Sequence, residues 1–222
     1  MSHLRHLSPI ETKIREQFYP EDPVLSLIQQ AITDDGKPAI NIGPEQGKAL
    51  QLLMTAIGAS RVLEVGTFYG YSAVWIGRAL PEHGQLICLE VSAEHAGKAS
   101  NFLAEAGLSE LVEIRVGQGR DLLPALAAEP PFDLIFLDAD RESYARYLDW
   151  VERLLRPGGI LAVDNAYMRG RLADPAPQPG EPHAAGYAGM SALLDRLAGS
   201  PQWVSTVLPF EDGLAVAVYK PG

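Results

Sequence analysis

Two hydrophobic periodicities divide this chain, and the change from one to the other predicts its architecture. Apolar residues recur at helical spacing in residues 9–19, 23–33 and 44–57. From residue 61 onward, short runs rich in β-branched residues alternate with further helical patterns. The predicted strands are residues 61–66, 85–90, 112–117, 132–138 and 159–164, and the helices between them are residues 71–80, 92–106, 121–128 and 141–156. Such alternation is typical of βαβ units, so we predict a parallel sheet with helices on both faces.

The end of the chain departs from this alternation. A helical pattern at 186–198 precedes two strand-like runs, 203–209 and 214–220, which are separated by only Phe210 to Gly213. Because a parallel crossover needs about a dozen residues, these two strands must be antiparallel. The predicted fold is α/β, a seven-stranded and mostly parallel sheet with one reversed strand and a C-terminal hairpin.

The length of 222 residues suits one α/β domain spanning residues 1–222. We divide it into N-terminal helices over 1–58 and a core of sheet and helices over 61–220. The segment 168–186 carries four prolines and has no periodicity, which predicts a loop insertion. Because it follows the strand that ends at Asp164, it should lie at the carboxyl edge of the sheet, where a substrate lid would be useful.

Charge and composition exclude several classes of protein. The formal net charge is −10 and there is no run of Lys or Arg, so nucleic acid is not expected as a partner. No apolar stretch reaches the roughly 20 residues that span a bilayer, and residues 1–9 lack the features of a signal peptide. We therefore expect a cytoplasmic protein without a membrane partner. The single cysteine, Cys88, stands inside a strand-like run and is expected to pack in the core.

Four predicted strands carry a carboxylate at or near their ends. These acids are Glu64, Glu90, Asp138 and Asp164. The carboxyl ends of parallel strands line one crevice, so the four side chains should converge on a single ligand site.

The motif EVGTFYGYS at 64–72 joins a predicted strand to a predicted helix. Gly66 and Gly70 allow a tight turn and leave free amides at the start of the helix. A dinucleotide-binding loop prefers the spacing GxGxxG, and here Glu64 stands where its first glycine would be. A carboxylate at that position favours a ligand with a positive amino group, such as an amino-acid portion. The alternative is a buried acid that backbone amides satisfy.

Glu90 ends the second strand, 20 residues after Gly70. A carboxylate there can accept hydrogen bonds from the ribose hydroxyls of either NAD or S-adenosylmethionine, and its position does not separate the two cofactors. Alternatively, Glu90 only caps the helix that begins near Ser92.

The motifs LDADRESY at 137–144 and VDNAY at 163–167 place oxygen-bearing side chains at two strand ends. Asp138, Asp164 and Asn165 together form a set of hard ligands that suits Mg²⁺ or a similar octahedral cation. In the alternative interpretation, Asp138 or its neighbour Asp140 caps the following helix, and Asp164 with Asn165 forms an Asx turn.

Taken in order, NIGPEQG, RVLEVGTFYGYS, LICLE, FDLIFLDAD, GGILAVDNAYMRG and LPFEDGLAVA resemble the cation-dependent O-methyltransferases related to catechol and caffeoyl-CoA O-methyltransferases. The resemblance covers about residues 38–220. It implies a Rossmann-like class I methyltransferase fold, S-adenosylmethionine as methyl donor, and Mg²⁺, or another divalent cation such as Mn²⁺ or Ca²⁺, that holds a vicinal diol on an aromatic ring. Members of this family are often homodimers.

The resemblance also implies roles for individual residues. It assigns Asp138, Asp164 and Asn165 to the metal. The residues that it assigns to the donor are Asn41, Ile42, Glu64, Gly66, Thr67, Ser72, Glu90, Gln118, Gly119 and, beside its metal role, Asp138.

Arg141 departs from the family pattern. Relatives have a lysine three residues after the first metal aspartate, which is thought to act as general base, and this chain has Arg141 there. A guanidinium is effectively never deprotonated, so it cannot accept the proton. We therefore expect metal coordination and solvent to deprotonate the substrate, with Arg141 as a catalytic residue that at most stabilises the phenolate electrostatically.

The sequence thus predicts an S-adenosylmethionine-dependent and metal-dependent O-methyltransferase whose acceptor is a small catechol-like aromatic diol or phenol. Two alternatives stay open at this stage. One is an NAD(P)-dependent oxidoreductase with a Rossmann-type site, which the glycine spacing and Glu64 disfavour. The other is an S-adenosylmethionine-binding module without turnover, in which Arg141 marks lost chemistry.

Overall fold

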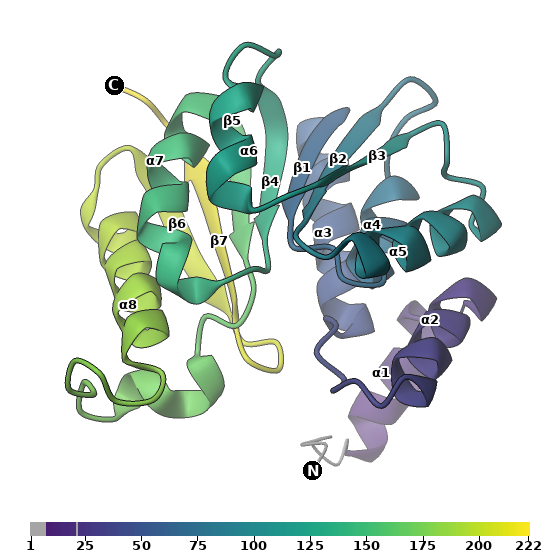
Figure 1. Ribbon diagram of the computed structural model, residues 1–222, viewed down its shortest axis with the longest axis horizontal. Coiled ribbons are helices and arrows are strands. Elements are labelled where there is room, and N and C mark those ends of the chain that lie inside the picture. The colour runs from purple at the N-terminus through teal and green to yellow at the C-terminus, as the bar shows by residue number, and fades with distance from the viewer. Residues whose placement is uncertain (1–7, 21) are drawn as a thin grey trace.

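The computed structural model describes residues 8–20 and 22–222, and it contains a seven-stranded sheet flanked by helices (Figure 1). Residues 1–7 of the predicted N-terminal segment lie outside the described residues. The strands are β1 (Arg61–Val65), β2 (Gln85–Glu90), β3 (Val112–Val116), β4 (Phe132–Leu137), β5 (Leu155–Val163), β6 (Trp203–Leu208) and β7 (Leu214–Tyr219). The helices are α1 (Pro9–Phe18), α2 (Pro23–Asp34), α3 (Pro44–Ile57), α4 (Tyr71–Gly77), α5 (Ala93–Glu105), α6 (Gly119–Leu126), α7 (Tyr144–Leu154) and α8 (Ala184–Gly199), with short 3₁₀ segments η1 (Arg141–Ser143) and η2 (Met168–Ala173).

The strand order β3-β2-β1-β4-β5-β7-β6 confirms the predicted sheet. Strands β1 to β5 pair in parallel, whereas β7 runs antiparallel to both β5 and β6. The reversed strand is therefore β7, and the hairpin predicted from the four-residue connection is present. In a sheet ordered in this way the chain leaves β1 and β4 on opposite sides, and their carboxyl ends flank the crevice in which ligands of such folds bind.

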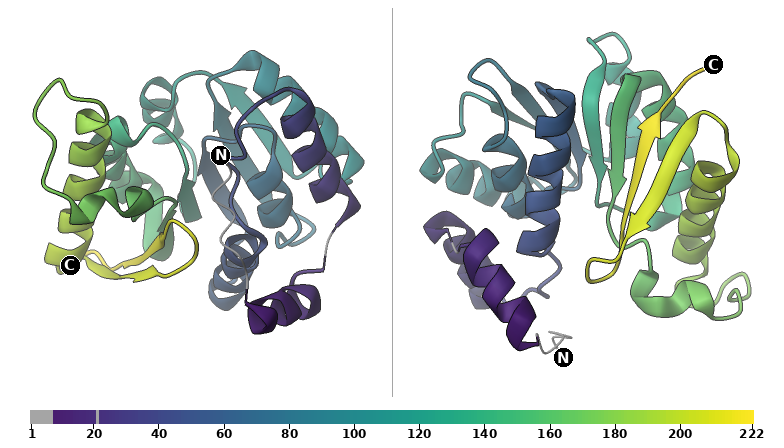
Figure 2. Two further views of the ribbon diagram at one scale, coloured as in Figure 1. Left: turned by 90° about the horizontal axis from the view of Figure 1, so that it is seen from below. Right: turned by 180° about the vertical axis from the view of Figure 1, so that it is seen from behind.

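Alternating residues of the five inner strands, β1, β2, β4, β5 and β7, face two separate apolar layers. In β1, Val62 faces the layer formed with α2 to α5, whereas Leu63 faces the layer formed with α6 to α8. Both side chains are fully buried. The two layers of helices are visible from behind and from below in Figure 2. Burial on both faces explains why the strands are near-continuous apolar runs, and it makes the few carboxylates at their ends conspicuous.

The N-terminal helices are fastened in two different ways. Helix α2 begins at the N-cap Asp22 and buries Leu25 and Ile28 against the sheet layer. Helix α1 buries none of its own residues, and Arg15 ties it by an ion pair to Glu45 in the first turn of α3. These helices and η2 lie at the end of the sheet where the parallel strands finish (Figure 1).

The structure differs from the sequence prediction in two segments near that edge. The predicted loop 168–186 is shorter, because residues 168–173 form η2 and α8 begins at Ala184. Met168 packs into the apolar layer of α6 to α8, which gives this part of the segment an anchor that its composition does not show. The predicted helix 141–156 is split into η1 and α7, and its last residues already belong to β5. No helix in the described part of the chain is long and apolar enough to cross a membrane.

Candidate active site

Gly66 brings the end of β1 against the end of β4. Its φ is +92°, and a Cβ at this position would overlap the carbonyl oxygen of Asp138. The amide of Asp138 donates to the carbonyl oxygen of Val65 at 2.9 Å, which fixes the same contact from the other strand. The glycine predicted from the motif is thus required both for its conformation and for the close approach.

Glu64 lies at the base of this loop and is completely buried. Its Oε2 accepts a hydrogen bond from the hydroxyl of Thr67, whereas its Oε1 has no partner in the described part of the chain. Burial raises the pKa of Glu64, and the hydroxyls of Ser72 and Thr67 oppose that rise. Backbone amides do not satisfy this acid, so the alternative interpretation of Glu64 is not what the structure shows. An unpartnered buried carboxylate oxygen is suited to a donor group of a bound ligand.

Glu90 faces the same loop from the end of β2. Its Oε2 accepts hydrogen bonds from the amides of Thr67 at 3.2 Å and Phe68 at 2.8 Å. Its Oε1 accepts from the amide of Ser92 at 2.9 Å, so the capping interpretation holds in part. Ser92 is nevertheless the N-cap of α5, and its own hydroxyl accepts from the amide of His95. The carboxylate is held in one orientation at the start of α5.

Asp164 and Asn165 follow β5 and lie beside the end of β4. The amide of Asp164 donates to the carbonyl oxygen of Leu137 at 3.0 Å, which places it next to Asp138. Asp164 Oδ2 accepts from Nδ2 of Asn165 at 2.6 Å. The structure therefore brings the three residues of the predicted metal site together at adjacent strand ends.

Burial raises the pKa of both aspartates. Burial raises the pKa of Asp138 well above its ordinary value, the neighbouring Asp164 and Glu64 carboxylates add to the effect, and Arg141 opposes it. Burial likewise raises the pKa of Asp164 to about 6, against hydrogen bonds from the Asn165 amide and from Gln46. The Asp138 carboxylate accepts no hydrogen bond from the described residues. Such a pair of close acids is stabilised by a cation between them.

The donor set fits a hard divalent cation. It offers two carboxylates and one amide oxygen, the ligand types that Mg²⁺ and Ca²⁺ prefer. Within residues 8–20 and 22–222 no cluster of three or more His, Cys, Asp or Glu side chains forms a metal site, so any ion here depends on the amide of Asn165. The capping alternative does not describe Asp140, because its side chain makes no cap bond and instead accepts from Tyr147 Oη at 2.6 Å.

Arg141 lies directly in this group. Its Nη2 donates to Oδ1 of Asn165, while its Nε is buried and has no partner among the described residues. Helix α8 fixes the backbone here, because a Cβ on Gly189 would overlap the carbonyl oxygen of Arg141. The guanidinium is thus placed beside the candidate metal ligands, where the resemblance predicts a base.

The remaining predicted donor residues lie on segments around the loop. Gly119 begins α6, and a Cβ there would lie 3.0 Å from Val65 at the end of β1. Gln118 precedes it as an exposed N-cap residue without a side-chain cap bond. Asn41 Nδ2 donates to the carbonyl oxygen of Ile42 at 3.1 Å, and neither residue forms a hydrogen bond with the acids. The structure joins Glu64, Thr67 and Glu90 by hydrogen bonds, whereas these other residues form no hydrogen bond with the two glutamates in the described part of the chain.

Sequence reasoning missed Gln46. This side chain is 2 % exposed, and its Nε2 donates to Oδ1 of Asp164 at 2.6 Å. The motif NIGPEQG contained the signal, since a glutamine three residues after Gly43 can close a capping box. Its Oε1 does accept from the amide of Gly43 at 3.0 Å.

Comparisons with known proteins concern the family and the fold. The family model described as O-methyltransferase matches residues 15–220. A catechol O-methyltransferase from Niastella koreensis is 38 % identical over 204 residues, which are 90 % of this chain and 91 % of the relative. The crystal structure of the O-methyltransferase TomG from Streptomyces achromogenes, in complex with SAM, is 34 % identical, covers 100 % of both chains and has a TM-score of 0.88. That of the O-methyltransferase from Bacillus cereus, in complex with SAH, is 32 % identical, covers 95 % of this chain and 97 % of that one, and has a TM-score of 0.86.

The fold and the site define a class I methyltransferase. The chain belongs to the O-methyltransferase family, which confirms both the resemblance seen in the sequence and the predicted enzyme class. The oxidoreductase and the module without turnover are thereby set aside.

Proposed function

We propose that this enzyme transfers the methyl group of S-adenosylmethionine to a hydroxyl of a small catechol-like aromatic substrate, with a divalent cation held by Asp138, Asp164 and Asn165. The observation that carries the proposal is the meeting of these three side chains at the ends of β4 and β5, next to the unpartnered carboxylate oxygen of Glu64.

The donor site is supported by two acids with different surroundings. Glu64, buried and with a free Oε1, suits the ammonium group of the donor's amino-acid end. Backbone amides hold the carboxylate of Glu90 in one orientation, in which it can also accept hydrogen bonds from ribose hydroxyls. The solved relatives with SAM and SAH lend weight to this choice of donor.

The acceptor is inferred from the oxygen ligands and from the catechol O-methyltransferase that this chain resembles. A free phenol has a pKa of about 10, and a bound divalent cation would favour its ionised form at neutral pH. Two carboxylates and one divalent ion sum to zero charge, so the site then tolerates an anionic acceptor. The order of events at the protein is orientation of both substrates, loss of the phenol proton to solvent, and in-line attack of the phenolate oxygen on the methyl carbon. The new oxygen–carbon bond forms as the sulfur–carbon bond breaks, and the sulfur leaves as a neutral thioether.

Other side chains of the site orient the metal ligands and balance their charge. Gln46 and Asn165 hold the carboxylate of Asp164 from both sides. Arg141, which stays protonated, contributes positive charge beside the acceptor oxygen and takes no proton from it. Solvent receives that proton.

The proposal is tested by methyl transfer to a panel of catechols and monophenols, followed by mass spectrometry, with Mg²⁺ and with EDTA. We expect transfer to diols that chelation abolishes and Mg²⁺ restores, and we expect Asp138→Asn to lose it. Asp121→Asn is a matched control, because Asp121 is exposed and its carboxylate pairs with its neighbour Arg120 alone within residues 8–20 and 22–222. Strong transfer in EDTA would reject the cation, and absence of transfer to every diol would reject the acceptor class. The homodimer and the cytoplasmic location stay predictions.

A further inference from the structure

We call the segment between β1 and α4, residues 66–70, the donor loop. It contains Phe68, whose backbone conformation is not explained by the roles proposed for Glu64 and Glu90. Phe68 has a φ of +51°, a left-handed conformation that is unfavourable for an aromatic residue. Its amide nevertheless donates one of the three backbone hydrogen bonds that orient Glu90. Something must hold this strained residue in place.

Aromatic packing provides the first support. The ring of Phe68 lies 4.3 Å from that of Tyr69 and 4.8 Å, edge-on, from that of His95, measured between centroids. The separation from His95 lies within the range of about 4.5–7 Å for favourable aromatic pairs, and that from Tyr69 lies just below it. The position of Phe68 therefore depends on where Tyr69 is fixed.

Tyr69 is fixed by two residues from outside the loop. Its side chain is fully buried, and its hydroxyl donates to Oδ2 of Asp35 at 2.6 Å. Nζ of Lys98 donates to the same hydroxyl at 3.1 Å and lies 4.8 Å from the centre of the ring. Asp35 is the C-cap of α2 and Lys98 stands in the middle of α5, so the hydroxyl joins an N-terminal helix to the loop.

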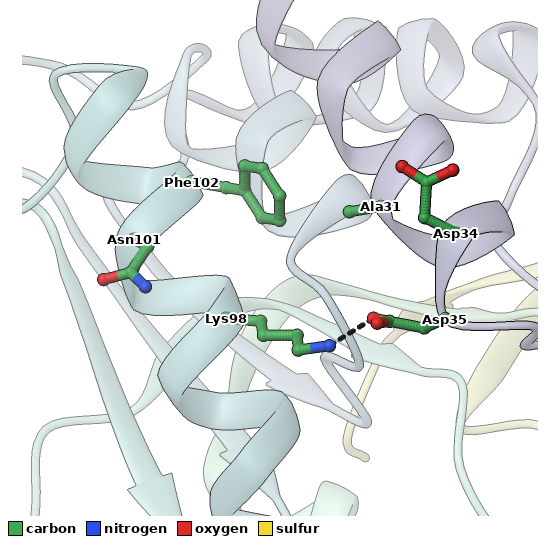
Figure 3. A pocket seen from close by; sticks show the side chains of 6 residues that line it. All are labelled: Ala31, Asp34, Asp35, Lys98, Asn101 and Phe102. Atoms are coloured by element: carbon green, nitrogen blue, oxygen red, sulfur yellow. Dashed lines mark hydrogen bonds and ion pairs between the residues drawn. The ribbon is translucent and has the colours of Figure 1, made fainter.

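Asp35 and Lys98 also bond to each other, and Figure 3 shows this pair in the wall of a pocket of about 300 Å³ between α2 and α5. The pocket makes the pair accessible to solvent, and the two side chains are 34 % and 31 % exposed. The hydrogen bonds to Lys98 and to Tyr69 hold the pKa of Asp35 below its ordinary value. The carboxylate and the ammonium are therefore both charged at neutral pH, as the arrangement requires.

We propose that Asp35, Lys98 and Tyr69 form a positioning set for the methyl donor: they hold Phe68 in its strained conformation, and thereby keep the loop amides aimed at Glu90. None of the three is assigned a contact with the donor. The proposal rests on the proposed function for the identity of that donor. It makes donor affinity depend on the end of α2, a segment more than 30 residues before the loop in the sequence.

The test is calorimetric titration of the full chain with S-adenosylhomocysteine. Tyr69→Phe removes only the hydroxyl, and Asp35→Asn removes only the charge. We expect each to raise the Kd by about threefold to tenfold, the effect of losing one hydrogen bond from a buried group. The double variant Asp35→Asn/Lys98→Met should have a Kd no higher than that of the single variant that binds less tightly, because the two residues act through one hydroxyl. In turnover, the KM for the donor should rise while kcat and the KM for the acceptor stay unchanged.

Asp34→Asn is the matched control, since Asp34 lines the same pocket but, among the described residues, its side chain bonds to Gln30 alone. Its Kd should equal that of the wild type. Unchanged affinity in Tyr69→Phe and Asp35→Asn, even with a lowered melting temperature, would reduce the set to a structural role and overturn the inference. Wild-type chain that fails to bind S-adenosylhomocysteine would overturn the proposed donor as well, so the two failures are told apart by the wild-type titration.

Discussion

Gln46 Nε2 donates a 2.6 Å hydrogen bond to Asp164 Oδ1, which links the first turn of α3 to the end of β5. The other amide atom of Gln46 accepts from the amide of Gly43, so the side chain has one orientation. The hydrogen bond from Nε2 favours the ionised form of Asp164, which is the form that binds a cation. Loss of this hydrogen bond should therefore weaken cation binding.

We therefore expect Gln46→Met to bind Mg²⁺ or Mn²⁺ roughly tenfold to a hundredfold more weakly than the wild type, the usual effect of removing a partner of a metal ligand. Calorimetric titration with the metal alone measures this. Gln51→Met is the control, since Gln51 stands on the same helix and donates to the carbonyl oxygen of Trp75 instead. Equal losses in the two variants would mean that α3 as a whole, rather than the bond to Asp164, was disturbed.

Arg141 replaces the residue that the resemblance assigns as general base. We expect Arg141→Ala to retain turnover, with kcat reduced by about tenfold, less than the roughly 10²-fold to 10⁴-fold contribution of a general base. Arg141→Lys should not exceed the wild type. Steady-state kinetics on a diol accepted by the wild type provide both numbers, with the exposed Arg146→Ala as control on the following helix. Near-complete loss in the alanine variant together with a several-fold gain in the lysine variant would restore the base role to this position.

Much of the fold can be predicted from periodicity, because strands that are buried on both faces of the sheet appear in the sequence as short, mostly apolar runs. The strands β1, β2 and β4 consist mostly of apolar residues, and the five-residue connection between β6 and β7 is too short for a parallel crossover. What the pattern could not show was η2. Its stability comes from Met168 packing against α6 to α8, a contact that no local sequence feature records.

The placement of Glu64, Glu90, Asp138 and Asp164 at the carboxyl edge of the sheet was predictable, because each stands at or near a strand end. The site was not predictable where a residue acts through tertiary contact. Gln46 reaches Asp164 across 118 positions of sequence, and Arg141 reaches Asn165 only because α8 packs tightly on η1. Such contacts depend on the packing angle of helices, which periodicity does not specify.

The raised pKa of Asp164 predicts a pH-dependent stability. In the folded chain this pKa is about 6, whereas the ordinary value is 3.8. The folded state thus binds the proton more tightly, so the contribution of this group is fully present below pH 3.8 and is lost as pH rises through 6. The wild type should therefore lose up to about 3 kcal/mol in its free energy of unfolding as pH rises. In EDTA we expect Asp164→Asn to lack this decrease and to be more stable than the wild type above pH 6. Urea unfolding at pH 4 to 8 measures it, and parallel pH profiles for the two proteins would contradict the assignment.

Gly66 combines a steric requirement with a left-handed backbone conformation. In Gly66→Ala, the φ of +92° would strain an alanine, and the new methyl would overlap the carbonyl oxygen of Asp138, so β1 and β4 would have to separate at their carboxyl ends. We expect a loss of about 2–3 kcal/mol in the free energy of unfolding, together with weaker binding of S-adenosylhomocysteine. For Gly97→Ala, which is the same chemical change, we expect a change of opposite sign in the free energy of unfolding. Gly97 is an exposed helical residue of α5 with nothing within 4 Å of its added Cβ, so the alanine should stabilise the chain by roughly 0.5–1 kcal/mol. Urea unfolding distinguishes the two signs, and a Gly66→Ala variant as stable as the wild type would show that the loop can move away from Asp138 without penalty.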